Sequence, residues 1–261
     1  MIPKKIHYCW FGRGKKPLLA EKCIQSWKRY CPDYEIIEWN EDNFDINSNQ
    51  YVKEAYNNKK YAFVTDFVRL LVTYTYGGIY MDTDIELLKP LDEYLNHEAV
   101  SGFENESQLQ TGLMACRKEF PLFKELLQFY DNIHFINDDG SLNLTTNVET
   151  ITNIMKSHGF IPNGKYQEIE GLVLYPKNIF CPEHSKLNDL DYMKDTVAIH
   201  FFSGSWKSEK TRKREASWWW KNIIVPISVY SHKLEKIGGK PYKLLKENLW
   251  KRIIQEKNNN K

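Results

Sequence analysis

A glycine pair, Gly77 and Gly78, follows a stretch in which apolar residues recur at helical spacing, from Tyr61 to Tyr76. The spacing predicts a helix, and a glycine pair is a typical helix stop because glycine tolerates left-handed backbone conformations. The apolar residues Ile79–Met81 are then predicted to form a short buried strand. A helix that passes through a tight turn into a buried strand indicates an α/β protein with helices packed on a sheet.

Strand and helix patterns alternate along most of the chain. Strands are predicted at Ile6–Trp10, Tyr34–Trp39, Ala99–Glu104, Gly112–Cys116, Leu172–Pro176 and Val197–Phe202. Helices are predicted at Pro17–Tyr30, Gln50–Asn57, Pro121–Ile133 and Val148–His158. The alternation predicts the α/β fold class, with one Rossmann-like sheet that is largely parallel and has helices on its faces.

The chain has 261 residues, of which 42% are hydrophobic, enough to bury one sizeable core. We therefore expect one main domain over residues 1–235, followed by a basic extension over residues 236–261. In the extension Leu245, Leu249 and Trp250 alternate with lysines in an amphipathic pattern that predicts a helix. The pattern leaves open whether its apolar face packs on the domain or on a membrane surface.

Charge and cysteine usage exclude several classes of protein. The net charge of +2 predicts no attraction to nucleic acid. The five cysteines are scattered, with no Cys-x-x-Cys pair, which indicates a reducing compartment and no structural zinc. A lysine pair near the N-terminus interrupts any secretory signal, and no run reaches the ~18 apolar residues of a membrane span. We expect a cytoplasmic protein whose basic extension is its candidate contact with the inner membrane face.

Two aspartates, Asp82 and Asp84, follow the predicted strand Ile79–Met81. In an extended chain their side chains would face the same way, about 6–7 Å apart along the backbone. Like charges at this distance repel each other unless a cation lies between them, and carboxylate oxygens suit Mg²⁺ or Mn²⁺. Because ligands bind beyond the carboxyl ends of strands in open α/β sheets, the pair predicts a site for a metal and a diphosphate.

Three other interpretations of the aspartate pair stay open at this point. An EF-hand calcium loop would need glycine where Leu87 stands. An aspartyl phosphotransferase of the haloacid dehalogenase type would need threonine or valine where Glu86 stands. The third interpretation is a pair of ordinary surface acids at a strand end.

Asp66 and Arg69 stand three residues apart, on one face of the helix that precedes the aspartates. A purely structural ion pair would contribute only ~0.5 kcal/mol if it were exposed. The helix leads directly into the strand that delivers Asp82, however. Arg69 is therefore also a candidate to bind a phosphate, or a sugar hydroxyl together with Asp66.

Ala62–Asp92 closely resembles the signature of glycosyltransferase family 32, the sugar transferases with a DXD sugar-binding region, in its bacterial capsule-type branch. Fungal mannosyltransferases and the glucosyltransferase domains of large clostridial toxins are related to this family. Ile2–Gly12 and His200–Trp206 resemble its two flanking motifs and occur in the expected order. The resemblance implies a GT-A fold with a mixed sheet, a nucleotide-sugar donor, a divalent metal and retention of the anomeric configuration.

The resemblance also implies roles for individual residues. Asp84 would contact the metal directly, and Asp82 the ribose, the sugar or the metal shell. His200, or the turn after it, would complete that shell, so that the expected metal ligands are Asp82, Asp84 and His200. The residues expected to bind the nucleotide sugar are Trp10, Phe11, Asp66, Arg69, Tyr80, Asp82, Thr83, Ser205 and Trp206, with Trp10 stacked on uracil. Asn147 and Glu149 are candidates for the acceptor side.

These residues together predict a metal-dependent retaining hexosyltransferase that takes a UDP-sugar and uses Mn²⁺ or Mg²⁺. The expected catalytic residues are Asp66, Arg69, Asp82 and Asp84. The resemblance implies a glycan acceptor, lipid-linked, in the synthesis of capsular or other surface polysaccharide. Nothing in the sequence identifies a nucleophile for a double displacement, which favours front-face substitution. The alternative is a noncatalytic module of the same fold that binds nucleotide sugars or glycans.

Overall fold

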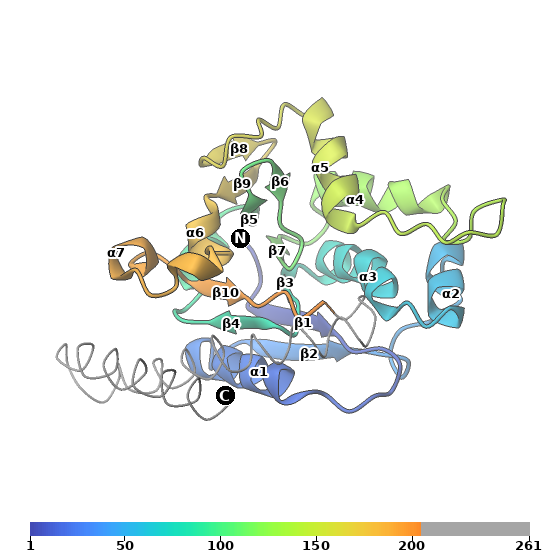
Figure 1. Ribbon diagram of the computed structural model, residues 1–261, viewed down its shortest axis with the longest axis horizontal. Helices are drawn as coiled ribbons and strands as arrows, with labels where there is room; N and C mark the ends of the chain where they lie inside the picture. Colours follow the sequence, from blue (N-terminus) through green and yellow to red (C-terminus); the bar gives the residue numbers. More distant parts are fainter. Residues whose placement is uncertain (205–261) are drawn as a thin grey trace, which may run out of the picture. The chain divides into compact units, whose positions relative to one another are not determined.

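A mixed β-sheet lies at the centre of the computed structural model, which describes residues 1–204 (Figure 1). The strands run in the order β2-β1-β3-β7-β5-β9-β8, and β6 pairs with β5. Their bounds are β1 Lys5–Cys9, β2 Glu35–Trp39, β3 Gly78–Met81, β5 Ala99–Asn105, β6 Gln108–Leu109, β7 Leu113–Cys116, β8 Gln167–Ile169 and β9 Leu172–Tyr175. The predicted α/β class is confirmed.

The prediction of a largely parallel sheet is wrong. Strand β1 pairs in parallel with β2 and β3, and β5 with β9, but β7 is antiparallel to both of its neighbours, β3 and β5. The reason is the short connection from β5 to β7, which contains only β6 and its turns. A parallel neighbour needs a crossover of a dozen or more residues. The mixed sheet agrees instead with the GT-A fold that the family resemblance implies.

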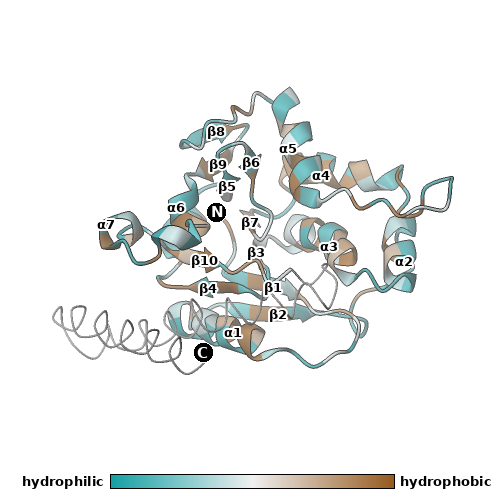
Figure 2. Ribbon diagram, viewed as in Figure 1, coloured by the Kyte–Doolittle hydropathy of each residue, from teal (hydrophilic) through white to brown (hydrophobic). Residues whose placement is uncertain are grey.

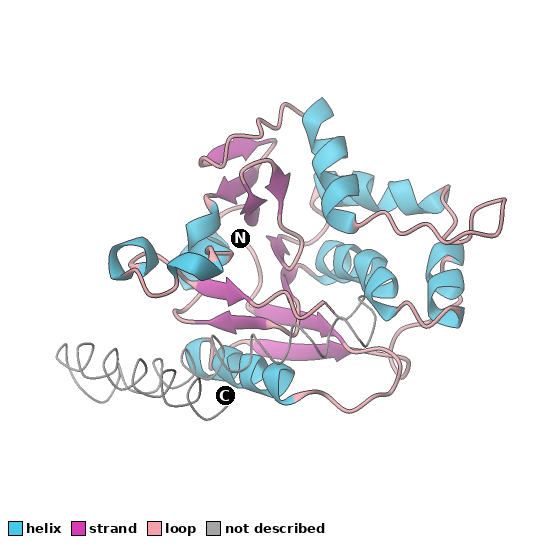
Figure 3. Cartoon of the chain, in the orientation of Figure 1, coloured by secondary structure: helices cyan, strands magenta, loops and turns pink. Residues whose placement is uncertain are grey.

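Helices flank the sheet, as the cyan ribbons of Figure 3 show. They are α1 Leu18–Tyr30, α2 Gln50–Asn57, α3 Tyr61–Tyr76, α4 Pro121–Gln128, α5 Asn147–Ser157, α6 Lys177–Phe180 and α7 Leu190–Met193, with 3₁₀ turns at Asp92–Asn96, Phe129–Asp131 and His184–Lys186. The bounds of α2 and α3 are those predicted. Helix α4 ends five residues before the predicted Ile133, where the chain tightens into the second 3₁₀ turn.

A separate two-stranded sheet joins β4, Ile85–Leu87, to β10, Ala198–His200, in antiparallel register. Helix α1 holds β4 in place, because Trp27 Nε1 donates to the Ile85 carbonyl at 2.7 Å and the Leu87 amide donates to Ser26 Oγ at 2.9 Å. The predicted strand Val197–Phe202 therefore exists as β10, outside the main sheet. Its partner β4 is too short to show an alternating pattern in the sequence.

The apolar face of α3 explains why this helix packs on the sheet. Val64, Val68, Leu70 and Val72 are fully or almost fully buried, and the helix contacts β1, β3 and β7. Figure 2 shows apolar residues along the central strands and a mixture of polar and apolar residues on the helices. Burial of each such side chain contributes roughly 1.5–3 kcal/mol, so this packing fixes α3 against the strand that follows it.

The turn from α3 into β3 depends on Gly77 and Gly78, whose φ angles are 65° and 114°. A Cβ atom at Gly78 would lie 2.8 Å from the Lys5 carbonyl oxygen of the adjacent strand. His7 closes the turn: Trp39 Nε1 donates to its Nδ1 at 3.1 Å, and its Nε2 donates to the Gly77 carbonyl at 2.9 Å. The predicted function of the glycine pair as a helix stop is confirmed.

The basic extension from residue 236, the proposed boundary near residue 235, and Ser205 and Trp206 all lie outside the described residues. These calls stay predictions. Within residues 1–204, no helix is long and apolar enough to cross a membrane. Met1–Phe202 forms one compact unit, and the fold and site below belong to it.

Replacing Gly78 by alanine is expected to destabilise the protein by about 1–3 kcal/mol, because the left-handed backbone would strain and the new Cβ would press on Lys5. Urea denaturation measures the change. Gly14→Ala is the matched control, since a Cβ there meets no atom within 4 Å. Equal effects of the two substitutions would contradict the account of the turn.

His158, at the end of α5, bonds to Glu170 through Nδ1 at 3.0 Å and to Glu125 through Nε2 at 2.9 Å. These two carboxylates raise the pKa of His158 above its ordinary value. Its contribution to stability is therefore fully present below about pH 6.5 and is lost as the pH rises through the raised value. At pH 6, His158→Gln should lower the free energy of unfolding by about 1 kcal/mol or less, which corresponds to a fall of a few degrees in the melting temperature. At pH 9 scanning calorimetry should detect almost no difference.

Candidate active site

A tight turn follows β3 and carries both aspartates. The Ile85 amide donates to the Asp82 carbonyl at 3.0 Å, and the Asp82 amide donates to the Gly112 carbonyl at 2.8 Å. The strand ends at Met81, as predicted, and the chain that follows it turns instead of continuing as a strand to Asp84. The turn, rather than strand alternation, brings the two carboxylates together.

His200 joins the two aspartates, although it lies far from them in the sequence. Asp82, Asp84 and His200 each offer one ligand atom, and the three atoms lie within 4.8 Å of one another. His200 Nε2 is 3.4 Å from Asp84 Oδ1 and 4.0 Å from Asp82 Oδ2. The pairing of β10 with β4 places His200 opposite Ile85, one residue after Asp84.

The donor set fits a hard divalent cation. Two carboxylate oxygens and one imidazole nitrogen are ligands that Mn²⁺ and Mg²⁺ accept. Burial alone would lower the pKa of His200, but the Asp84 carboxylate raises it well above its ordinary value. A centre with two carboxylates that favours a positive charge is suited to a metal ion as well. The burial of Asp84 also argues against the interpretation as ordinary surface acids.

Arg69 lies next to this centre and is almost fully buried, with 6% of its side chain exposed. Its Nη2 is 3.1 Å from Asp66 Oδ1 and 3.4 Å from Asp82 Oδ1. Its Nη1 donates to the carbonyl and the hydroxyl of Thr111, at 2.6 and 3.1 Å. The predicted pair with Asp66 is therefore present, but as part of a buried network that also orients Asp82.

Asp66 occupies the other end of this network. Burial raises the pKa of Asp66 to about 7, whereas Arg69 and the backbone amide of Asn147 oppose the rise. Asn147 is the first residue of α5, where backbone amides point out of the helix and favour negative charge. Its side chain donates to the Asp66 carbonyl at 3.1 Å and accepts from Tyr130 at 3.3 Å. The N-terminus of α5 therefore holds Asp66 in place.

Residues 17–101 match the model of a glycosyltransferase sugar-binding region that contains a DXD motif. The chain is 29% identical over 149 residues to inositol phosphoceramide mannosyltransferase 3 of Schizosaccharomyces pombe, over 51% of this chain and 40% of that protein. It is 24% identical over 280 residues to the initiation-specific alpha-1,6-mannosyltransferase of Candida albicans, over 80% and 73%. Residues 17–101 therefore resemble the sugar-binding region of the DXD-containing glycosyltransferases.

The chain spans well under half the length of the first of these curated relatives. A solved structure that resembles it is the PaToxG glycosyltransferase, with a TM-score of 0.47 and 18% identity over 60% of this chain and 69% of that one. In this chain the DXD motif is Asp82-Thr83-Asp84, and the matched region contains both its aspartates and the Asp66–Arg69 pair.

Tyr80 and Phe11, two of the residues expected to bind the nucleotide sugar, are buried. The Tyr80 hydroxyl donates to Asp82 Oδ1 at 2.7 Å, and the Arg69 guanidinium lies 4.8 Å from its ring centroid. The Phe11 ring packs edge-on against Phe44 in the core. Tyr80 therefore orients Asp82 of the DXD motif from within the core. The contacts of Phe11 are those of a core residue.

Trp10, Thr83 and Glu149 are more accessible. Trp10 is partly exposed after β1, and its Nε1 donates to the Gly14 carbonyl at 2.6 Å, which fixes the indole in the loop. Thr83 is partly exposed within the DXD turn. Glu149 is exposed on α5, and its backbone amide donates to Thr146 Oγ1 at 3.4 Å, which caps the helix. The contacts near Asp66 thus come from Asn147 rather than from Glu149.

The DXD site consists of Asp66, Arg69, Asp82, Asp84 and His200. Sequence reasoning missed Thr111 and Gly112, which precede β7 and lie among these residues. A Cβ atom at Gly112 would lie 2.8 Å from His200 Cε1 and 3.1 Å from Asp82 Oδ2. The missing side chain therefore makes room for both groups. The signal that predicts this position is the strand order, because the start of an antiparallel β7 meets the carboxyl end of β3.

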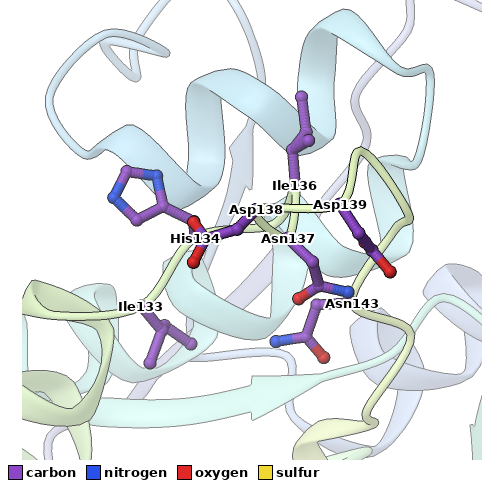
Figure 4. A pocket seen from close by; sticks show the side chains of 7 residues that line it. All are labelled: Ile133, His134, Ile136, Asn137, Asp138, Asp139 and Asn143. Carbon is purple, nitrogen blue, oxygen red and sulfur yellow. The ribbon is translucent and has the colours of Figure 1, made fainter.

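An open cavity of about 530 Å³ lies elsewhere, in the segment between α4 and α5 (Figure 4). It is lined by Ile133, His134, Ile136, Asn137, Asp138, Asp139 and Asn143, and by no residue of the DXD site. Asp139 accepts hydrogen bonds from the backbone amide and the hydroxyl of Ser141, at 2.9 and 2.6 Å. Its carboxylate therefore stabilises the loop itself.

Replacing Arg69 by methionine is expected to destabilise the protein by about 3–5 kcal/mol, because the buried Asp66 and the partly exposed Asp82 would lose their cation. Arg13→Met is the matched control: its ion pair with Asp42 is more than half exposed on both sides and should cost at most about 1 kcal/mol. Urea denaturation of both variants measures the difference. An Arg69 variant as stable as the control would rule out the network described above.

Proposed function

We propose that this chain is a metal-dependent glycosyltransferase that moves a hexose from a nucleotide sugar to a hydroxyl of a glycan. The observation that carries the proposal is the convergence of Asp82, Asp84 and His200 within 4.8 Å, in a chain whose residues 17–101 match a DXD sugar-binding region. Mn²⁺ or Mg²⁺ held by these three side chains would offset the charge that develops on the departing nucleoside diphosphate.

The neighbouring residues support the same chemistry. Arg69 and Tyr80 both contact Oδ1 of the Asp82 carboxylate, so that little reorganisation is needed during the reaction. Asp66, held by Arg69 and by α5, is the group proposed to bind hydroxyls of the transferred sugar. Trp10 is proposed to stack on the base. Thr83, Ser205 and Trp206 remain predicted contacts of the nucleotide sugar.

The donor and acceptor are proposed from the family. We propose a UDP-sugar, with GDP-mannose as the alternative because both curated relatives are named mannosyltransferases. The proposed acceptor is a lipid-linked glycan in capsular or other surface polysaccharide synthesis, at the inner face of the membrane. Retention is proposed to follow front-face substitution, in which the incoming hydroxyl approaches on the side of the leaving diphosphate.

Asp84→Asn is expected to lower the Mn²⁺-dependent release of nucleoside diphosphate from a sugar donor by about 10²–10³-fold. The reason is that the metal loses a charged ligand at the place where negative charge develops on the leaving diphosphate. Release is measured for UDP-glucose, UDP-galactose, UDP-N-acetylglucosamine and GDP-mannose. Asp138→Asn, on an exposed loop, is the control and should keep full activity.

The alternative function, a noncatalytic module that binds nucleotide sugars, predicts a different pattern. Such a protein would gain thermal stability from Mn²⁺ and a nucleotide sugar but release no nucleotide with any donor or acceptor. That result for the wild type would refute the transferase. An Asp84→Asn variant with normal activity would refute the assignment of the metal site.

A further inference from the structure

Glu104 is a carboxylate near the DXD site that the proposed function leaves unused. It lies at the carboxyl end of β5, and β7 lies between β5 and β3 in the sheet. Because β7 is antiparallel to both, its first residues, beside Gly112, lie at the edge where β3 and β5 end. The edge that presents Asp82 therefore also presents Glu104.

The pairing of β5 with β6 is irregular at Glu104. Phe103 pairs with Leu109 and Asn105 pairs with Gln108, so Glu104 is the extra residue on β5. Phe103 is fully buried in the core, and Cys181 Sγ donates to the Glu104 carbonyl at 4.0 Å from the end of α6. Bulges of this kind often turn a side chain toward a site.

The Glu104 side chain is partly buried, yet its carboxylate forms no hydrogen bond or ion pair with any residue of the described chain. A carboxylate can accept several hydrogen bonds, so its capacity is unused. Burial raises its pKa, and Asp82 adds to the rise, whereas His200 and Arg69 oppose it. This direction of the pKa shift agrees with the place of Glu104 at the edge of the sheet where β3 and β5 end.

The position of Glu104 fits the acceptor better than the donor. Front-face substitution brings the incoming hydroxyl to the side of the diphosphate, which is the side of the metal ligands. Glu104 lies at the carboxyl end of β5, at the edge that also presents Asp82, whereas Asp66, proposed for the transferred sugar, lies on α3. In the sheet, β5 also lies on the far side of β3 from β1, which leads to Trp10.

We propose that Glu104 binds a hydroxyl of the incoming glycan acceptor and so determines how that sugar enters the site. The inference rests on the proposed function, because it takes the DXD site as the place of transfer. The ligand class is a neutral sugar with a free hydroxyl, which donates to the carboxylate.

Saturation-transfer NMR in the presence of UDP and Mg²⁺ tests the proposal. The probes are the methyl glycosides of glucose, galactose, mannose and N-acetylglucosamine. Wild-type protein should bind at least one of them, and Glu104→Gln should weaken that binding about tenfold, because a hydrogen bond to a charged acceptor is replaced by one to a neutral amide. The UDP signal and the melting temperature should stay unchanged.

Glu168→Gln is the matched control, since Glu168 is an exposed glutamate on β8 of the same sheet. Glycoside binding that persists in Glu104→Gln, or a wild type that binds none of the glycosides, would overturn the inference. Parallel loss of the UDP signal would also overturn it, because Glu104 would then act on the donor side. If the glycoside signal depends on Glu104 but no donor releases nucleotide, the inference stands as a glycan site and the proposed transferase activity fails.

Discussion

The buried guanidinium of Arg69 is the interaction on which the rest of the site depends. It lies between Asp66 on its own helix and Asp82 after β3, and it bonds to Thr111 before β7. One cation therefore ties three elements together at the same edge of the sheet. Because buried charges are costly unless they are paired, each of these elements has little freedom to move independently.

The antiparallel strand β7 makes this arrangement possible. A parallel strand in its place would direct its first residues toward the opposite edge of the sheet. In the observed order, Thr111 reaches Arg69, and Gly112 leaves room for His200 beside Asp82. The mixed topology thus has a direct consequence for the site, since the two residues before β7 shape it without carrying any charge.

Much of the fold could be predicted from the sequence wherever periodicity was strong. The apolar spacing of α3 and the glycine pair after it gave the helix, the turn and β3 with nearly their observed bounds. The direction of β7 was missed, although the short segment between the predicted strands Ala99–Glu104 and Gly112–Cys116 leaves no room for a parallel crossover. Strand β4 was missed because three residues show no alternation, and with it the physical link from His200 to Asp84.

The candidate site was predicted in composition but not in geometry. The residues that resemble the family's signature were found, and Asp82, Asp84 and His200 do come together. The sequence did not show that a turn rather than a strand joins the aspartates. The sequence also did not show which of these residues are buried. Tyr80 and Asn147, which are buried and support other site residues, could therefore not be distinguished from accessible residues such as Trp10.

The balance of charge explains why such a site would bind its ligands together. Asp66, Asp82, Asp84 and Glu104 supply four carboxyl groups, against the permanent cation of Arg69 and a titratable His200. Even with Asp66 neutral and His200 protonated, the three ionised carboxylates Asp82, Asp84 and Glu104 outnumber the two cations, so the centre around the DXD motif stays negative. A diphosphate alone would be repelled from it, as like charges repel strongly where water is scarce. Under the proposed function, the arrangement therefore favours a nucleotide that arrives with a divalent cation. A sugar hydroxyl suits Glu104 because it is neutral and adds no further negative charge to the site.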